Sequence, residues 1–238
     1  MKNISKYFLL TLVAFLSILN AQTFSVNSKD GRNQATFTSE APFEKIVGVS
    51  SGLNAVAMID IKDLSNAKGK VTVPIANLKT GISLRDEHLR SENWLNAEKY
   101  PNAEFMLTGI KGANKLSDQV PVNVTLTGKF SVHGVTKDIS VPAKLTYFKE
   151  SPKTKARAEG NLLVVDTKFT IKLADYNVQI PDMVKGKLSE DVEVAVNFIA
   201  SDANAAAGAC NPCGNKSDAN ANPCSMKKSN PCNPCAMK

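Results

Sequence analysis

The sequence predicts an all-β protein whose strands close into a barrel. Apolar residues recur at every second position through most of residues 33–198, which is the pattern of half-buried strands. The period changes only in one short stretch, residues 78–105, and the pattern elsewhere yields eight or nine strands. A meander of this size must protect its edge strands, and closure into a barrel is the simplest way to do so.

The first 21 residues are expected to be a secretory signal peptide rather than part of the fold. Lys2 and Lys6 form a positive segment, and residues 7–19 form a nearly continuous apolar run. This run is shorter than the roughly 20 apolar residues needed to cross a bilayer. We expect cleavage after Ala21 and export of the mature chain to a bacterial periplasm; a retained membrane anchor is the alternative.

The amino-terminal strands are expected on either side of the 78–105 stretch. Their apolar positions are Ala35 and Phe37, a looser run over 43–49, then Leu53, Ala55, Ala57, Ile59 and Ile61, then Val71, Val73 and Ile75, and finally Ala103, Phe105 and Leu107. Each set has the period of two that places its members on one face of a strand.

The carboxy-terminal strands begin with the clearest hairpin signal in the chain. Residues 122–132 and 139–147 alternate with opposite parity, and residues 133–137 turn the chain between them. We interpret His133 as a turn residue beside Gly134, which supplies the positive φ, rather than as a ligand. The last two strands follow, with apolar positions Leu163, Val165, Phe169, Ile171 and Leu173, then Val192, Val194, Val196 and Phe198.

The 78–105 stretch is predicted to form one or two short helical turns. Ser91 is the expected N-cap, and Pro101 ends the turns. Charge is concentrated just before Ser91. One interpretation is that Arg85, His88 and Arg90 form a cationic rim for a phosphate or carboxylate, because arginine offers a planar fork of donors.

The alternative for the same stretch is a solvated connection between strands. In that interpretation Trp94, Leu95 and Phe105 plug one end of the barrel. Trp94 is the only tryptophan of the chain. Residue types and spacing alone do not separate the two interpretations.

Two segments resemble a known family. They are TGISLRDEHLRSENWLNAEKYPNAEF, residues 80–105, and LTGKFSVHGVTKDISVPAKL, residues 126–145. Together they resemble the YceI-like, polyisoprenoid-binding family over about residues 23–200. The resemblance implies an extended lipocalin-like antiparallel β-barrel over residues 22–200, with a long apolar cavity for an isoprenoid-type lipid. Asn177 replaces a glycine often found in the family, although asparagine also tolerates the left-handed region.

If the interior holds a lipid, apolar faces of the predicted strands should line it. The expected wall residues are Ala57, Phe105, Phe130, Ala143 and Phe169. A tapered, fully packed barrel also needs small residues on these faces, so the pattern does not show whether the interior is hollow. The resemblance implies a carrier that requires no cofactor, whose partners are an amphiphilic lipid and, transiently, a membrane.

An enzymatic function is not expected. Residues 48–52 match the G-x-S-x-G pattern of serine hydrolases, but a nucleophile elbow requires a strand-to-helix turn. Ser50 lies between two predicted strands, and only His88 and His133 are available as a base. We keep hydrolysis through Ser50 only as a hypothesis to be checked against the fold.

The net charge of +7 does not indicate a nucleic-acid partner. Lys2 and Lys6 contribute +2 and the segment from Ser201 contributes +2, which leaves +3 for residues 22–200. Those charges are spread over both signs, with no basic face interleaved with aromatic residues.

Residues 201–238 form a low-complexity segment with repeated Asn-Pro-Cys and no Val, Ile, Leu or aromatic residue, so we expect disorder. Its five cysteines suit three alternatives: disulfides or redox-labile thiols, capture of a soft metal ion, or a neutral repeat. The first two define a second functional hypothesis, a metal- or thiol-handling protein with the barrel as scaffold. The cysteines are Cys210, Cys213, Cys224, Cys232 and Cys235.

Overall fold

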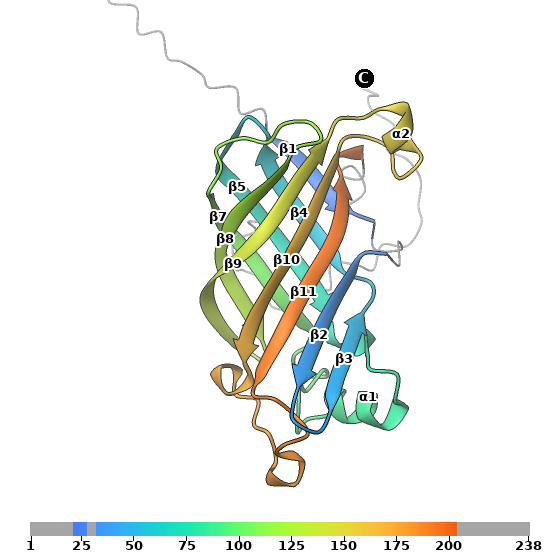
Figure 1. Cartoon of the computed structure of the whole chain (residues 1–238), viewed down its shortest axis with the longest axis vertical. Helices are drawn as coiled ribbons and strands as arrows, with labels where there is room; N and C mark the ends of the chain where they lie inside the picture. Colours follow the sequence, from blue (N-terminus) through green and yellow to red (C-terminus); the bar gives the residue numbers. More distant parts are fainter. Residues whose placement is uncertain (1–20, 28–31, 204–238) are drawn as a thin grey trace, which may run out of the picture.

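The computed structural model describes residues 21–27 and 32–203. Eight antiparallel strands form a closed barrel, which confirms the predicted fold class (Figure 1). Hydrogen bonding between the first and last of these strands completes the ring. The strands in ring order are β1 (Gln22–Val26), β4 (Asn54–Asp60), β5 (Asp63–Pro74), β7 (Asn102–Lys111), β8 (Pro121–Val132), β9 (Val135–Phe148), β10 (Leu162–Lys172) and β11 (Asp191–Ser201).

Three more strands extend the wall at one end. They are β2 (Gln34–Glu40), β3 (Lys45–Ser50) and the short β6 (Leu78–Lys79). β11 makes this possible because it is longer than β1: its last residues pair with β1, whereas residues 192–197 pair with β2. The barrel is therefore longer than its closed ring, and β2 and β3 lie beside α1 in Figure 1.

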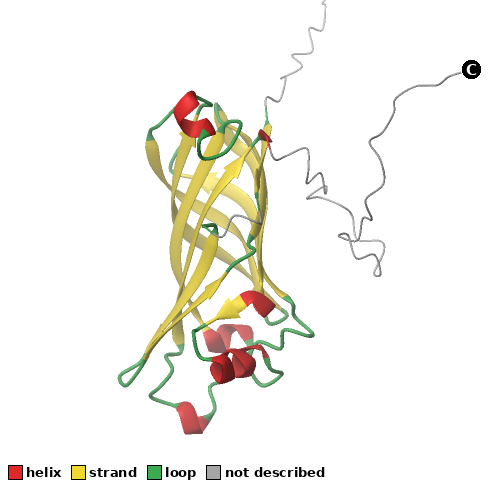
Figure 2. Cartoon of the chain, turned by 90° about the vertical axis from the view of Figure 1, so that its right-hand side faces the viewer, coloured by secondary structure: helices red, strands yellow, loops and turns green. Residues whose placement is uncertain are grey.

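The helices lie at the two ends of the barrel. α2 (Pro152–Lys155) is at one end, and most of the other helical turns gather at the opposite end (Figure 2). These turns are η1 (Ile75–Asn77), α1 (Ser83–Arg90), η2 (Leu173–Tyr176) and η3 (Asp182–Val184). In the described part of the chain, no helix is both long and apolar enough to span a membrane.

The helical insert is confirmed, but the predicted role of Ser91 is wrong. Ser91 is the C-cap of α1 rather than the N-cap of a later turn. Its backbone N–H donates to the carbonyl of His88 at 3.0 Å, and its hydroxyl donates to the same carbonyl at 2.7 Å. A serine hydroxyl both donates and accepts, and here it donates to a carbonyl of the last helical turn instead of accepting from an N–H of a following turn.

The predicted β8–β9 hairpin is present, but its turn is shorter than the predicted residues 133–137, because residues 135–137 already belong to β9. Val132 pairs with Val135, and both residues between them have positive φ, 50° for His133 and 76° for Gly134. A two-residue turn of this kind requires positive φ at both positions to match the twist of the strands. Asn177 at the end of η2 likewise adopts the left-handed conformation, with φ 58°.

β1 is not predicted from the sequence, because recognisable alternation begins only at residue 33. β1 spans only Gln22–Val26 and lies directly after the predicted signal peptide. Phe24 within it has no exposed surface. At the other terminus β11 includes Ser201, and Asp202 accepts hydrogen bonds from the Asn161 backbone and side chain at 2.8 and 2.6 Å.

Candidate ligand-binding cavity

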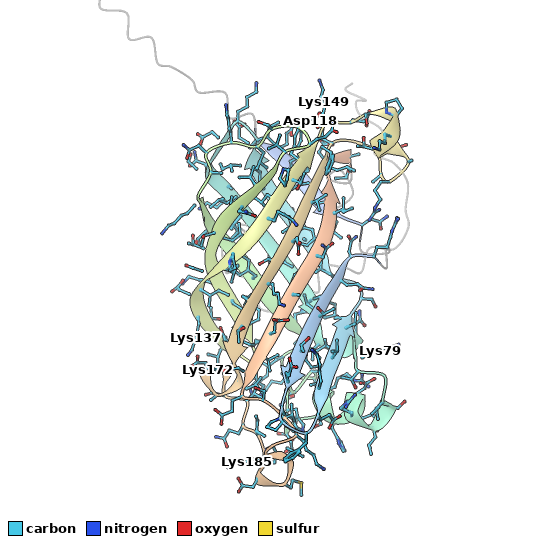
Figure 3. The ribbon with its side chains drawn as sticks, in the orientation of Figure 1. Lys79, Asp118, Lys137, Lys149, Lys172 and Lys185 are labelled. Atoms are coloured by element: carbon cyan, nitrogen blue, oxygen red, sulfur yellow. The ribbon has the colours of Figure 1, made fainter. Side chains whose placement is uncertain are left out.

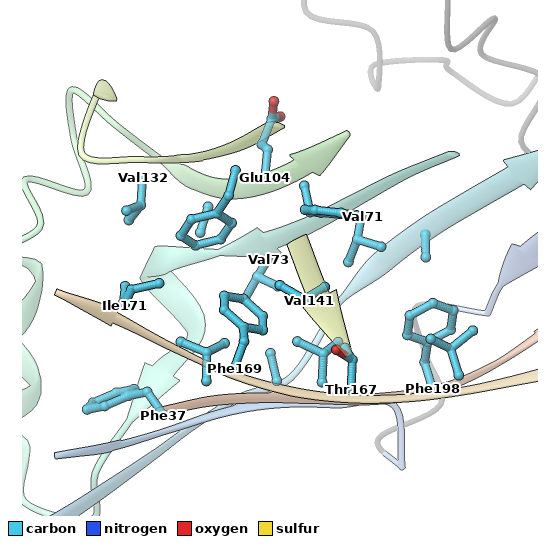
Figure 4. A pocket seen from close by; sticks show the side chains of 18 of the residues that line it. Phe37, Val71, Val73, Glu104, Val132, Val141, Thr167, Phe169, Ile171 and Phe198 are labelled. Carbon is cyan, nitrogen blue, oxygen red and sulfur yellow. The ribbon is translucent and has the colours of Figure 1, made fainter. Parts of the chain in front are cut away.

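The barrel encloses an apolar cavity of about 230 Å³ that extends along its axis. Inward-facing side chains from β2, β4, β5, β7, β8, β9, β10 and β11 form the wall (Figure 4). Aromatic rings and β-branched residues dominate it, as expected for alternate positions of half-buried strands. Among the wall residues are Phe37, Val71, Val73, Phe105, Phe130, Phe169, Ile171 and Val194.

One end of the cavity is closed. Phe24, Leu163 and Ala200 line it there and are exposed by 0%, 1% and 2%. The Phe24 ring packs edge-to-face against Tyr147, with 6.4 Å between ring centroids. These residues belong to the main hydrophobic core, which seals the end of the barrel that carries α2.

The other end of the cavity opens toward solvent. Phe105 and Phe169 face the barrel interior and pack against the core, yet both are only partly buried. Three segments surround this opening, which we call the mouth. Their cavity-lining residues are Leu89, Trp94 and Leu95 from residues 83–95, Leu173, Val178 and Leu188 from residues 173–190, and Phe37 from the β2–β3 hairpin.

Four of the five predicted wall residues line the cavity: Ala57, Phe105, Phe130 and Phe169. Phe130 makes edge-to-face contacts with Phe169 and Tyr176, at centroid distances of 5.6 and 5.5 Å. The fifth, Ala143, lies outside the described lining. It is buried, and it pairs with Val124 and Thr167 on the two neighbouring strands. Contact of these residues with a lipid stays a prediction.

The three predicted cationic residues lie on α1, and both arginines are already engaged with the protein. Arg85 donates to Glu44 at 2.6 Å and to the Thr80 hydroxyl at 2.8 Å. Arg90 donates to the carbonyl of Leu78 at 3.2 Å. Within the described cavity wall, neither arginine nor His88 contributes to the lining. The arginines fasten α1 to the β2–β3 turn and to β6, and their contact with a lipid head group stays a prediction.

Asp86 is the buried polar centre that holds α1 in place. One of its carboxylate oxygens accepts hydrogen bonds from the hydroxyl of Thr80 at 2.6 Å and from its backbone N–H at 2.7 Å. These bonds, the hydroxyl bond first, lower the pKa of Asp86, and Arg90 and Arg85 lower it further. Because the folded-state pKa is depressed, the stabilisation is complete above the unfolded value of about 3.9 and is lost as the pH falls through the folded value.

We expect Asp86→Ala to loosen the mouth without unfolding the barrel. The Thr80 N–H loses its partner, so amide hydrogen-exchange protection of residues 80–90 should fall by about tenfold or more. Glu87→Ala, at an exposed position on the same helix, is the matched control. Equal protection in the two variants, or a wild-type α1 whose protection does not change between pH 5 and pH 2, would contradict this role.

His133 anchors the segment on the opposite side of the mouth. Its Nδ1 lies 3.1 Å from the backbone carbonyl oxygen of Tyr176, and because a carbonyl only accepts, the Nδ1–H donates. The His133 ring also packs edge-to-face on Tyr100, with centroids 5.1 Å apart. The turn residue predicted from sequence thus ties η2 to the hairpin. Burial is the main cause of the raised pKa of Tyr176, and nearby Asp175 adds to it.

The structure gives no support to the serine-hydrolase pattern. Ser50 is the last residue of β3 and has no exposed surface, and its hydroxyl donates to the carbonyl of Pro74 at 3.0 Å. Gly52 follows with φ 79° and leads into β4 rather than into a helix. Among the described residues, no group of His, Cys, Asp or Glu could hold a metal ion. The five cysteines and residues 1–20 of the predicted signal peptide lie outside the described residues.

Sequence reasoning missed part of the mouth. The sequence pattern predicts Leu173 at the end of a strand and gives no role to Val178 or Leu188, whereas all three line the mouth. The 173–190 segment has no regular period, because it folds into two short 3-10 turns and irregular loops. The only available signal was a few apolar residues isolated among polar ones.

An eight-stranded antiparallel barrel with an apolar interior open at one end is of the kind that encloses a single small ligand. The model of the YceI-like domain matches residues 24–200. The chain belongs to the YceI-like family. Protein YceI of Escherichia coli O157:H7 is 30% identical over 152 residues, which are 64% of this chain and 72% of the relative.

A UPF0312 protein of Pseudomonas aeruginosa (strain LESB58) is 33% identical over 140 residues, 58% of this chain, and the match spans 64% of the length of that relative. Solved structures show the same fold. BcnA of Burkholderia cenocepacia superposes with a TM-score of 0.59 at 17% identity, over 74% of this chain and 99% of that one. A polyisoprenoid binding domain from Saccharophagus degradans gives 0.58 at 14% identity, over 76% and 98%.

Proposed function

We propose that this protein is an exported carrier that holds an isoprenoid-type or other amphiphilic lipid inside the barrel. The observation that carries the proposal is the apolar cavity that is sealed at the Phe24 end and open at the mouth. A similar fold is described as a polyisoprenoid binding domain in Saccharophagus degradans. Export is supported by the signal-like residues 1–21.

The lining suits a hydrocarbon chain. Transfer of each methylene from water into an apolar site is favourable by about 0.8 kcal/mol. Two charged residues contribute to the wall, Lys70 and Glu104, but their side chains pair with each other at 2.8 Å and are partly exposed to solvent. Glu104 points away from the cavity in Figure 4. Among the described lining residues there is therefore no unpaired charge that a bound hydrocarbon chain would have to desolvate.

Native mass spectrometry of the protein purified from its own host tests this function. We expect a peak heavier than the polypeptide by the mass of one lipid, and lipid extraction should return the protein to the polypeptide mass. Loading the stripped protein with a polyprenyl lipid should restore the heavier species. A stripped protein that takes up neither a polyprenyl lipid nor a phospholipid would contradict a lipid-carrier function.

A further inference from the structure

We propose that the mouth of the barrel docks on the surface of a phospholipid bilayer through four exposed apolar side chains. These are Phe43, Ile82, Leu84 and Met183, which we call the mouth patch. Phe43 and Met183 are exposed by 84% and 85%, and Ile82 and Leu84 by 53% and 62%. The inference rests on the proposed function, because a lipid carrier must receive its cargo from a membrane or deliver it there.

The mouth patch belongs to the same three segments that line the opening. Met183 lies in η3, within the 173–190 segment, and Phe43 lies in the turn between β2 and β3. Ile82 and Leu84 lie at the beginning of α1. Each segment therefore presents apolar residues both to the cavity and to solvent. Such residues, carried at the rim of an apolar cavity, mark an interaction surface rather than the chance exposure of single side chains.

Contacts between the segments place the mouth patch at one end of the molecule. A Cβ atom added to Gly186 would lie 3.3 Å from the Phe43 ring, so the η3 loop and the β2–β3 turn are side by side. The ion pair between Arg85 and Glu44, 2.6 Å long, joins the first turn of α1 to the same β2–β3 turn. The four apolar side chains thus belong to neighbouring loops.

The charges near the mouth patch favour a lipid surface without requiring an anionic one. Arg85 pairs with Glu44, Lys185 pairs with Asp182, and Lys45 pairs with Glu40. Lys79 and Lys185 lie toward this end in Figure 3. Because both signs are present and three of these cations are paired, we expect weak long-range attraction, so apolar insertion must supply most of the affinity. A bilayer interface accepts apolar side chains and also solvates ion pairs at the level of its head groups.

The test is flotation of the mature, full-length protein with vesicles of phosphatidylcholine, alone and mixed with phosphatidylglycerol. We expect the protein to float with both, and added salt to change the bound fraction little. The double variant Phe43→Ser with Met183→Ser should lower partitioning by about tenfold or more, because two large apolar side chains are lost from the interface. Met58→Ser with Val120→Ser, exposed positions outside the mouth patch, is the control.

The outcomes separate docking from cargo binding. A wild-type protein that floats with no vesicle, or a control pair that reduces flotation as much as the mouth pair, would overturn the docking surface. Retention of a lipid by that same protein in native mass spectrometry would leave the carrier function standing and point to a protein partner at the mouth. Flotation that depends on the mouth patch without any cavity lipid would support docking while contradicting the carrier function.

Discussion

Replacing Ala57 with phenylalanine is expected to expel the lipid while leaving the empty barrel folded. Ala57 lines the cavity and lies opposite Gly69, where a Cβ atom would be only 3.3 Å from that of Ala57. Because Gly69 has no side chain, the new ring can occupy the void above it. When a lipid is bound, the new ring and the lipid compete for the same space, and overpacking of this kind costs about 1–3 kcal/mol. The affinity for the lipid should therefore fall by about ten- to a hundredfold.

The stability of the lipid-free protein distinguishes a cavity from a packed core. In a packed core, Ala57→Phe would destabilise the fold by about 1–3 kcal/mol, whereas in a cavity the added ring gains contacts that the empty space lacks. Denaturant unfolding of the lipid-free protein measures the change in its free energy of unfolding, and native mass spectrometry measures lipid occupancy. Met58→Phe is the control, because the Met58 side chain, next to Ala57 in β4, is 41% exposed. Full occupancy in Ala57→Phe would remove Ala57 from the ligand site.

Alternation alone was sufficient to predict most of the barrel. Long strands such as β8 and β9 keep one face toward the barrel interior, so their apolar residues recur with a period of two over twelve or more consecutive residues. β1 has only five residues and pairs with β11 at only two positions. Too few positions repeat in such a strand for a pattern to emerge, although its position closes the ring.

The site was predictable only in part, because the wall and the mouth are built differently. Wall residues such as Phe105 and Phe169 lie on regular strands, so their inward direction follows from parity. Whether that interior is hollow depends on how side chains of different strands meet, as the burial of Ala143 among its neighbours shows. Arg85 illustrates the same limit at the mouth, since its partner Glu44 is 41 residues away in sequence.

The mouth combines an anchored frame with exposed apolar tips. Asp86 holds α1 through Thr80, and His133 holds η2 through the Tyr176 carbonyl. Such anchors keep the opening in place when no lipid fills it, which reduces the ordering that binding would otherwise require. The exposed tips, including Phe43 and Met183, can then contact another surface without rearrangement of the cavity wall.

Phe24→Ala is expected to destabilise the protein by about 3–5 kcal/mol, the usual range for truncating a fully buried phenylalanine. Phe24 has no exposed surface, pairs with Ala57 across the β1–β4 ladder and packs against Tyr147. Its loss leaves a void at the point where β1 completes the ring between β4 and β11. Urea unfolding of the mature protein, monitored by circular dichroism, measures the change.

Thr23→Ala tests whether this effect arises from the sealed end rather than from the strand itself. Thr23 is only half-buried and lies opposite the exposed Met58, so its truncation should cost less than about 1 kcal/mol. Equal losses in the two variants would mean that Phe24 does not seal the barrel. The expected signal cleavage after Ala21 leaves β1 intact. A mature chain that begins after Phe24 should be destabilised at least as much as Phe24→Ala, because it lacks both the Phe24 side chain and most of β1.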